Sequence, residues 1–354
     1  MARQPSDPQA GAFVYVSTSG DAAITVFRMK SATAEPEMLQ KIPIASLANT
    51  AGGLSTPMAV SPDGRHLHVA IRKPPLPVAS FAIDGESGRL TALGLARIPA
   101  STPFLATDRT GRYLFSAANP GATLAVNAID ADGHVAPRAR QMLHIGHKLH
   151  CIVIDKGNRN LYVSSTDDEV IFQFMFDAET GTLQPNDPPF VKLSGGQDPR
   201  HMALSPDGRF LYATTEAGGR VVCFAVDGAT GRLTEKSSIG MMPGDFSGGP
   251  LTADIHLTPD GRFLYATERR LHTIVAYRVD LATGALSLIE ATTTEKVPRA
   301  FAIAPDGSFL VVLGEDTGKM VAYAIDRDTG KLVKGVELPL GQKPNWIEFL
   351  VPPI

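Results

Sequence analysis

The sequence has few cysteines, no long apolar run and no large excess of charge of either sign. Two cysteines in 354 residues exclude a disulfide framework, and we expect Cys151 and Cys223 to be reduced thiols buried in strands. No stretch approaches the roughly 20 apolar residues of a membrane span. The first residues also lack the apolar core of a secretory signal. We therefore expect a cytoplasmic protein with no membrane partner.

The charge balance excludes another class of partner. The formal net charge is −3, so no broad basic face is available and nucleic acid is not expected to bind. The 44% hydrophobic and 19% charged residues are typical of a folded globular protein. Binding of a small molecule is more consistent with this composition than binding of a long polyanion.

What the sequence does contain is a repeat. A strand–turn–strand unit occurs six times and is typified by "PRHMALSPDGRFLYATTE", residues 199–216. The leucine that follows each turn serves as an anchor, and these anchors lie 46 to 53 residues apart. They are Leu67, Leu114, Leu161, Leu211, Leu264 and Leu310. This period is typical of propeller blades.

A second pattern follows each copy and completes the blade. It is typified by "VVCFAVDGATGRLTE", residues 221–235, and occurs seven times. The missing seventh first half is split between "GAFVYVSTS" near the N-terminus and "KPNWIEFL" near the C-terminus. We predict an all-β fold, a seven-bladed β-propeller with four-stranded blades, as a single domain of residues 1–354. Its last blade is closed by strands from both termini, which leaves no unpaired edge between first and last blade.

The repeat also predicts where polar residues converge. The first strand of a blade lines the channel of a propeller, and its start lies on the same face as the end of the second strand. Residues eleven before and five after each anchor should therefore meet at one mouth of the channel. The first set is Thr56, Pro103, His150, Arg200, Ala253 and Arg299, and the second is Arg72, Asn119, Thr166, Glu216, Arg269 and Glu315.

These two sets contain an unusual number of charged residues. Grouped charges cost solvation free energy unless they pair or hold a ligand. Arginine binds carboxylate or phosphate through paired donors, so we predict a site for a small anionic ligand. The alternative is structural: Arg200 and Glu216 form an ion pair between strands, and His150 is a satisfied core histidine.

Metal and cofactor motifs are weak or absent. His144, His147 and His150 follow one another at steps of three, but on a strand the middle side chain points away from the other two. We assign no carboxylate or cysteine ligand to this stretch, so we expect no metal site. Phosphate-binding loops, dinucleotide fingerprints and nucleophile elbows are missing, so no cofactor is expected. Asp254 and His256 begin another channel strand, where bonding to neighbouring blades is the usual role.

These motifs resemble the seven-bladed propeller lactonases, which comprise bacterial propeller-type 6-phosphogluconolactonases and fungal 3-carboxy-cis,cis-muconate lactonizing enzymes. The resemblance covers essentially the whole chain and is strongest in "GQDPRHMALSPDGRFLYATTE", "VPRAFAIAPDGSFL" and "GQKPNWIEF". It implies four catalytic residues: His150, Arg200, Glu216 and Arg299. As candidate substrate-binding residues at the same mouth we take Arg72, Asn119, His201, Asp254 and Arg269.

The chemistry of these residues fits lactone hydrolysis. An activated water and a stabilised oxyanion are required, and no metal is needed if a base and fixed cations are present. Glu216 or His150 would activate the water, while Arg200 and Arg299 would bind an anionic group and polarise the ring carbonyl. We expect a hydrolase of carbohydrate metabolism that acts on a sugar lactone, with 6-phosphoglucono-δ-lactone as candidate, in a monomer or weak homo-oligomer.

Two other functions stay open from the sequence. A lactonizing cycloisomerase would use the same arginines to hold carboxylates, with His150 protonating carbon. A non-catalytic propeller would instead serve as an interaction platform. The platform predicts charged or apolar patches on the rim, whereas an enzyme predicts a polar funnel at the channel mouth.

Overall fold

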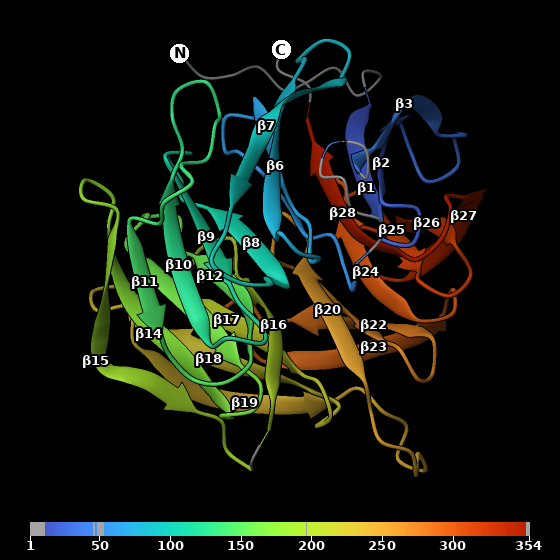
Figure 1. The fold of residues 1–354 in the computed structure, drawn as a ribbon. Helices are drawn as coiled ribbons and strands as arrows, with labels where there is room; N and C mark the ends of the chain where they lie inside the picture. Colours follow the sequence, from blue (N-terminus) through green and yellow to red (C-terminus); the bar gives the residue numbers. More distant parts are fainter. Residues whose placement is uncertain (1–10, 45–46, 48–52, 196, 352–354) are drawn as a thin grey trace, which may run out of the picture.

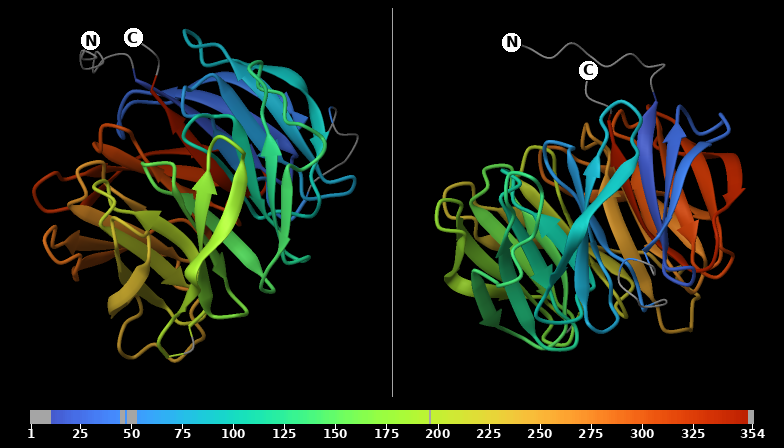
Figure 2. Two further views of the ribbon diagram at one scale, coloured as in Figure 1. Left: turned by 90° about the vertical axis from the view of Figure 1, so that its left-hand side faces the viewer. Right: turned by 45° about the horizontal axis from the view of Figure 1, so that its top comes forward.

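The predicted seven-bladed β-propeller is confirmed. A computed structural model describes residues 11–44, 47, 53–195 and 197–351, and contains 28 named strands in seven four-stranded sheets (Figure 1). In Figure 2 the sheets follow one another around a ring in the order of the sequence. Within the described part of the chain, no helix has the length and apolar character needed to cross a membrane.

The blades are numbered here from the first sheet that is continuous in sequence. Blade 1 contains β4 (Met58–Val60), β5 (His66–Ala70), β6 (Pro77–Ile83) and β7 (Leu90–Arg97). Blade 2 contains β8 (Phe104–Thr107), β9 (Tyr113–Ala117), β10 (Thr123–Ala128) and β11 (Gln141–His144). Blade 3 contains β12 (Leu149–Ile154), β13 (Asn160–Ser165), β14 (Val170–Asp177) and β15 (Thr182–Lys192).

The remaining blades continue this order. Blade 4 contains β16 (Pro199–Leu204), β17 (Phe210–Thr215), β18 (Arg220–Val226) and β19 (Leu233–Gly240). Blade 5 contains β20 (Thr252–Leu257), β21 (Phe263–Glu268), β22 (Thr273–Val279) and β23 (Leu286–Thr293). Blade 6 contains β24 (Pro298–Ile303), β25 (Phe309–Gly314), β26 (Lys319–Ile325) and β27 (Leu332–Pro339). Blade 7 contains β28 (Pro344–Leu350), β1 (Ala12–Thr18), β2 (Ala23–Met29) and β3 (Glu37–Pro43).

Blade 7 joins the two ends of the chain as the sequence predicted. Strand β28 pairs antiparallel with β1, with Phe13 opposite Leu350 and Ser17 opposite Trp346. Figure 1 shows β28, in red, directly beside β1, in blue. This pairing closes the ring, because each half of the blade supplies the hydrogen-bonding edge that the other half lacks.

The apolar core lies between blades. Every residue of β17 is buried because both faces of a second strand contact neighbouring sheets, whereas five of the eight residues of the outer strand β19 are exposed. One cluster packs Tyr212 and Cys223 of blade 4 against Ile255 and Leu264 of blade 5. Both cysteines of the chain are free and buried, as expected.

Tyrosines one residue after the anchor leucine add a polar link between blades. The hydroxyl of Tyr212 on β17 donates to the carbonyl of Gly284, in the β22–β23 turn of the next blade, at 3.0 Å. Gly284 has a φ of +75°, and a Cβ there would lie 2.5 Å from the ring of Phe210, so glycine permits both the turn and the close approach. The same bond recurs from Tyr162 to Gly231, from Tyr265 to Gly330, and from Tyr15 on β1 to Gly88.

We predict that Tyr212→Phe lowers the free energy of unfolding by about 1–2 kcal/mol, because the buried Gly284 carbonyl loses its donor. Denaturant unfolding monitored by circular dichroism measures the change. Tyr113→Phe is the matched control, since its bond to the Glu179 carbonyl is longer, 3.3 Å, and only partly buried. Equal losses in the two variants would show that the bond to Gly284 has no special role.

Candidate functional site

The channel strands of five blades carry a β-bulge at the same mouth. In blade 4, Pro199 pairs with Thr215 and Met202 pairs with Ala213, so two residues of β16 together oppose Thr214. The residues that fall in the bulges are His150 and Cys151, Arg200 and His201, Ala253 and Asp254, Arg299, and Asn345. Bulges redirect side chains, which explains how the consecutive Arg200 and His201 both border one pocket.

Hydroxyl side chains satisfy the backbone at three of these bulges. Thr214 Oγ1 accepts a hydrogen bond from the His201 amide at 3.2 Å, and Thr267 Oγ1 accepts one from the Asp254 amide at 3.0 Å. Ser164 Oγ accepts from the Cys151 amide at 3.0 Å. These residues come three positions after the anchor leucine. Their recurring hydroxyl is the sequence signal that would have revealed the bulges.

Glu216 lies at the centre of the charged cluster. Its Oε1 accepts hydrogen bonds from Arg200 Nε at 3.1 Å and from Arg269 Nη2 at 2.5 Å, while Oε2 lies 3.8 Å from Lys148 Nζ. Burial by itself raises the pKa of this carboxyl, but the charges of Arg200 and Arg269 outweigh it, so the pKa lies below its ordinary value. Glu216 is therefore a carboxylate held by three cations.

Arg200 is almost completely enclosed, with an exposed fraction of 1%. Besides its bond to Glu216, it donates from Nη1 to the Ala253 carbonyl of the next blade at 2.7 Å. Its Nη2 has no hydrogen-bond partner among the described residues, and the side chain borders the pocket. Burial and the charges of Arg269 and Arg299 lower the pKa of Arg200 to about 9. Arg200 is thus a fixed guanidinium at the pocket with one nitrogen that bonds to no described residue.

Arg299 and Arg72 differ in how firmly they are held. Arg299 donates no hydrogen bond to another described residue, and its nearest acid is Glu315, with Nη1 and Oε2 3.8 Å apart. All three nitrogens of Arg72 are occupied, by the Ser101 and Ser55 hydroxyls and by the Asn119 carbonyl at 2.9–3.1 Å. Arg299 is therefore the more available of the two for a ligand.

Two histidines stand side by side in the bulges of blades 3 and 4. The ring centroids of His150 and His201 are 5.2 Å apart. Burial and the nearby Arg200 charge hold the pKa of His150 well below its usual range, and its buried Nδ1 has no partner among the described residues. His201 Nδ1 lies 2.7 Å from Asp254 Oδ1. Both imidazoles are therefore neutral, but only that of His201 is oriented by a carboxylate.

The pocket brings most of the predicted catalytic residues together. Its lining consists of Ser55, Pro103, His150, Arg200, His201, Arg299, Ala300, Asn345 and Trp346. Glu216, Arg269 and Arg72 stand outside this lining, with Glu216 and Arg269 joined to it through Arg200. Trp346 is half-buried at the pocket, packs against a core cluster with its ring, and donates from Nε1 to Glu348 Oε1 at 2.8 Å.

A larger cavity, of about 300 Å³, occupies the channel beyond His201. Its polar lining residues are His201, Asp254, His256 and Glu348, and Phe301 and Trp346 contribute aromatic faces. Burial raises the pKa of Glu348 to about 7. Asp254 links three blades, as its position at the start of a channel strand suggested. One of its carboxylate oxygens lies 2.7 Å from His201 Nδ1, and the other accepts a hydrogen bond from the Phe301 amide.

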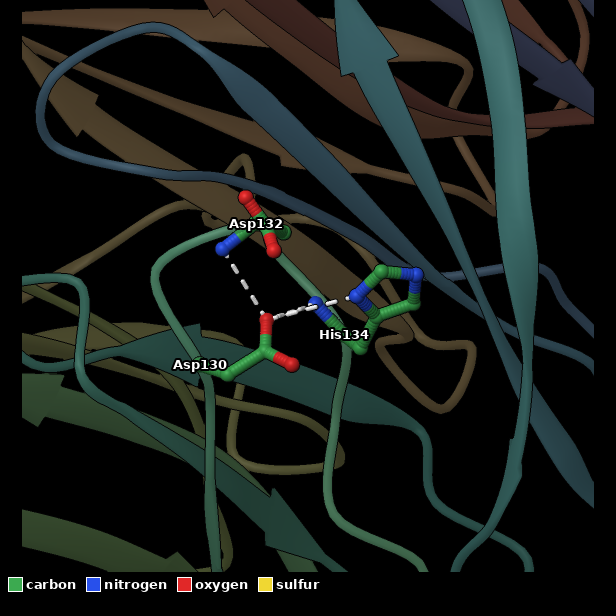
Figure 3. A group of neighbouring side chains, drawn as sticks. All are labelled: Asp130, Asp132 and His134. Atoms are coloured by element: carbon green, nitrogen blue, oxygen red, sulfur yellow. Dashed lines mark hydrogen bonds and ion pairs between the residues drawn. The ribbon is translucent and has the colours of Figure 1, made fainter.

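Potential metal ligands gather away from this mouth. Among the described residues, Asp130, Asp132 and His134 bring three ligand atoms together, on the exposed turn that follows β10 (Figure 3). Asp130 Oδ1 already accepts hydrogen bonds from the amides of Asp132 and His134, at 3.0 and 2.9 Å. This is the pattern of a hydrogen-bonded turn. His147 pairs with Asp168, and His144 contacts Thr123, so these two do not converge with His150.

Comparison with known proteins points to one family. The family model "Lactonase, 7-bladed beta-propeller" matches residues 44–349. A Serratia proteamaculans protein named 6-phosphogluconolactonase is 34% identical over 337 residues, which cover 95% of this chain and 98% of that protein. A Pectobacterium carotovorum protein of the same name is 34% identical over 82% of this chain and 84% of its own length. The solved structure of the Pseudomonas aeruginosa periplasmic gluconolactonase PpgL has a TM-score of 0.86 at 27% identity, covering 97% and 99% of the two chains.

We predict that Glu216→Gln lowers the free energy of unfolding by about 3 kcal/mol at neutral pH, because buried Arg200 and Arg269 lose their counter-charge. The folded-state pKa of Glu216 is lowered, so its stabilisation is complete above the ordinary carboxyl pKa and is lost as pH falls through the folded value. The difference between wild type and variant should therefore shrink in acid.

Glu315→Gln is the matched control for this experiment, because its only described arginine partner lies 3.8 Å away and the contact is loose. Thermal unfolding of both variants between pH 3 and 7 provides the measurement. A Glu315→Gln loss as large as that of Glu216→Gln would contradict the assignment of Glu216 as the central counter-charge.

Proposed function

The chain belongs to the seven-bladed β-propeller lactonase family, and we propose that it hydrolyses the ring ester of a sugar lactone, with 6-phosphoglucono-δ-lactone as candidate substrate. The observation that carries the proposal is the group of residues at the channel mouth. His150, Arg200 and Arg299, from three different blades and far apart in sequence, surround one small pocket of about 10 Å³. The relatives named 6-phosphogluconolactonase and the similar gluconolactonase structure support the same substrate class.

Arg200 is suited to stabilise the oxyanion. When water attacks the lactone carbonyl carbon, negative charge develops on the carbonyl oxygen, and a fixed donor is most effective there. The guanidinium of Arg200 is anchored by Glu216 and the Ala253 carbonyl and keeps Nη2 for the pocket. We assign Arg200 to the carbonyl oxygen and Glu216 to the positioning of Arg200. Three cations around Glu216 weaken it as a base.

Arg299 is suited to bind the anionic group of the substrate. Its guanidinium borders the pocket and has only a loose contact with Glu315. A phosphate or carboxylate would satisfy two of its donors at once. The positive charges of Arg72 and Arg269 add to the potential without direct contact, since their nitrogens are largely bonded to protein. The site thus favours a lactone that carries negative charge.

We predict that the purified protein accelerates the hydrolysis of 6-phosphoglucono-δ-lactone, and that Arg299→Gln raises KM for this substrate about 10- to 100-fold, because a charge-assisted contact is lost. The KM for unphosphorylated glucono-δ-lactone should change less. A pH-indicator assay corrected for spontaneous opening measures both. Arg220→Gln serves as control, since Arg220 lies on β18 and bonds to the exposed Ser238.

The same assay separates the alternative functions. Interconversion of a carboxymuconate and its lactone without hydrolysis of either aldonolactone would identify a lactonizing cycloisomerase. No turnover of any of these compounds would favour the interaction platform. An equal change of KM for both lactones in Arg299→Gln would remove Arg299 from the phosphate contact.

Treatment with a chelator tests whether hydrolysis depends on a metal ion. We predict that exhaustive EDTA treatment leaves kcat unchanged, because the proposed chemistry uses arginines in place of a Lewis acid. Asp132→Asn on the exposed turn should likewise retain full activity. Complete loss of activity that a divalent ion restores would contradict the metal-independent mechanism.

A further inference from the structure

Hydrolysis needs a general base that takes a proton from the attacking water, and two candidates at the mouth are poorly suited. Glu216 is neutralised by Arg200, Arg269 and Lys148. His150 is buried next to Arg200, and its Nδ1 finds no partner within the described part of the chain. An imidazole with neither an orienting acceptor nor a counter-charge is a weak base, because the imidazolium that forms would be unstabilised.

His201 has both features that His150 lacks. Its Nδ1 lies 2.7 Å from Asp254 Oδ1. Asp254 is in turn fixed by the amides of Ile255 and Phe301, at 3.0 and 3.1 Å, and by His256 Nε2 at 3.3 Å. Burial raises the pKa of Asp254, but the neighbouring His256 and His201 outweigh this and lower it, so Asp254 is an ionised acceptor. The proton of neutral His201 therefore resides on Nδ1, and Nε2 presents its lone pair.

The surroundings of His201 place this ring at the pocket. The bulge of β16 puts it beside Arg200, and both line the pocket together with Arg299. Phe104 contacts the ring edge to face, with centroids 5.5 Å apart, and Trp346 lies 6.1 Å away. His201 Nε2 has no hydrogen-bond partner among the described residues. The orientation of the His201 ring is thus held by the Asp254 carboxylate and by packing against Phe104 and Trp346, and Nε2 is free to bind a ligand or water.

We propose that His201 is the general base of the hydrolysis and that Asp254 is its positioning residue. The proposal rests on the lactonase function proposed above. His201 Nε2 removes a proton from water as the water oxygen bonds to the lactone carbonyl carbon, and the carbonyl electron pair moves to the oxygen facing Arg200. When the ring C–O bond breaks, the imidazolium returns the proton to the departing alkoxide. The products are the open hydroxy acid, which ionises to a carboxylate, and a proton released to solvent.

Asp254 contributes to both steps of this sequence. It keeps His201 in the tautomer whose Nε2 is unprotonated, and its negative charge stabilises the transient imidazolium. Titratable or charged groups face His201 from five strands: His150 on β12, Arg200 on β16, Asp254 and His256 on β20, Arg299 on β24 and Glu348 on β28. Burial and Arg200 lower the pKa of His201 to about 4. The imidazole is therefore neutral, with Nε2 unprotonated, throughout the physiological pH range, and Asp254 supplies the counter-charge when it takes a proton.

The test compares His201→Asn with wild type on the aldonolactone that wild type hydrolyses best. Asparagine can still donate to Asp254 from near the Nδ1 position but offers no base. We expect kcat to fall 100-fold or more with KM changed less than threefold, and the acid limb that the lowered pKa of His201 gives the kcat/KM profile in wild type to disappear. His134→Asn on the exposed turn is the matched histidine control and should keep wild-type kcat.

Two further variants keep the proposal falsifiable if His201→Asn is unstable. In His201→Ala, added imidazole should restore part of kcat, because the deleted ring leaves space beside the pocket. Asp254→Asn should lower kcat by a similar factor through the wrong tautomer, while melting temperature shows whether each variant folds. Wild-type kcat in folded His201→Asn, or an acid limb that disappears in His150→Asn and persists in His201→Asn, would overturn the proposal. Absence of lactone hydrolysis by the wild type would instead refute the proposed function.

Discussion

The arrangement of the site depends on the recurring β-bulge in the channel strands. A regular strand directs consecutive side chains to opposite faces, so Arg200 and His201 would otherwise diverge. The extra residue in β16 turns both towards the pocket, and equivalent bulges present His150, Asp254, and Arg299 from neighbouring blades. Backbone amides that lose a partner strand at the bulge donate instead to side-chain hydroxyls, as the His201 amide does to Thr214 Oγ1. The bulge is therefore a stable feature of the fold.

Neighbouring blades supply the hydrogen-bond acceptors that the buried Arg200 requires. Arg200 is the largest fully buried side chain among the described residues, and a buried guanidinium is tolerated only with nearby acceptors. Glu216 and the Ala253 carbonyl provide them from the same blade and the next. Arg299 retains unsatisfied positive charge at the pocket. The positive potential of the mouth is therefore set by the protein itself, through side chains held in place by interblade packing.

Interblade packing and hydrogen bonds between blades hold the site residues at fixed relative positions. The tyrosine bonds between blades, such as Tyr212 to Gly284, and the closed pairing of β28 with β1 fix each sheet relative to its neighbours. The His201–Asp254 bond also crosses from one blade to the next, because these residues lie on β16 and β20. Residues of the site come from several blades, so their mutual distances are set by interblade packing more than by any single strand.

The sequence by itself determined the architecture and the channel mouth at which the candidate site residues converge. Strand periodicity and a repeat of 46 to 53 residues depend on local patterning, so they predicted seven blades, the split seventh blade and the mouth where His150, Arg200, Glu216 and Arg299 gather. The tertiary structure alone decided which of these residues contact one another within that mouth. It showed that Glu216 is shielded by cations, that Arg72 is occupied by protein, and that Trp346 borders the pocket. It also joined His201 to Asp254, which are 53 residues apart. Such pairings arise from bulges and from contacts between blades, where register and side-chain direction depend on the neighbouring sheet and leave no periodic signal in the chain.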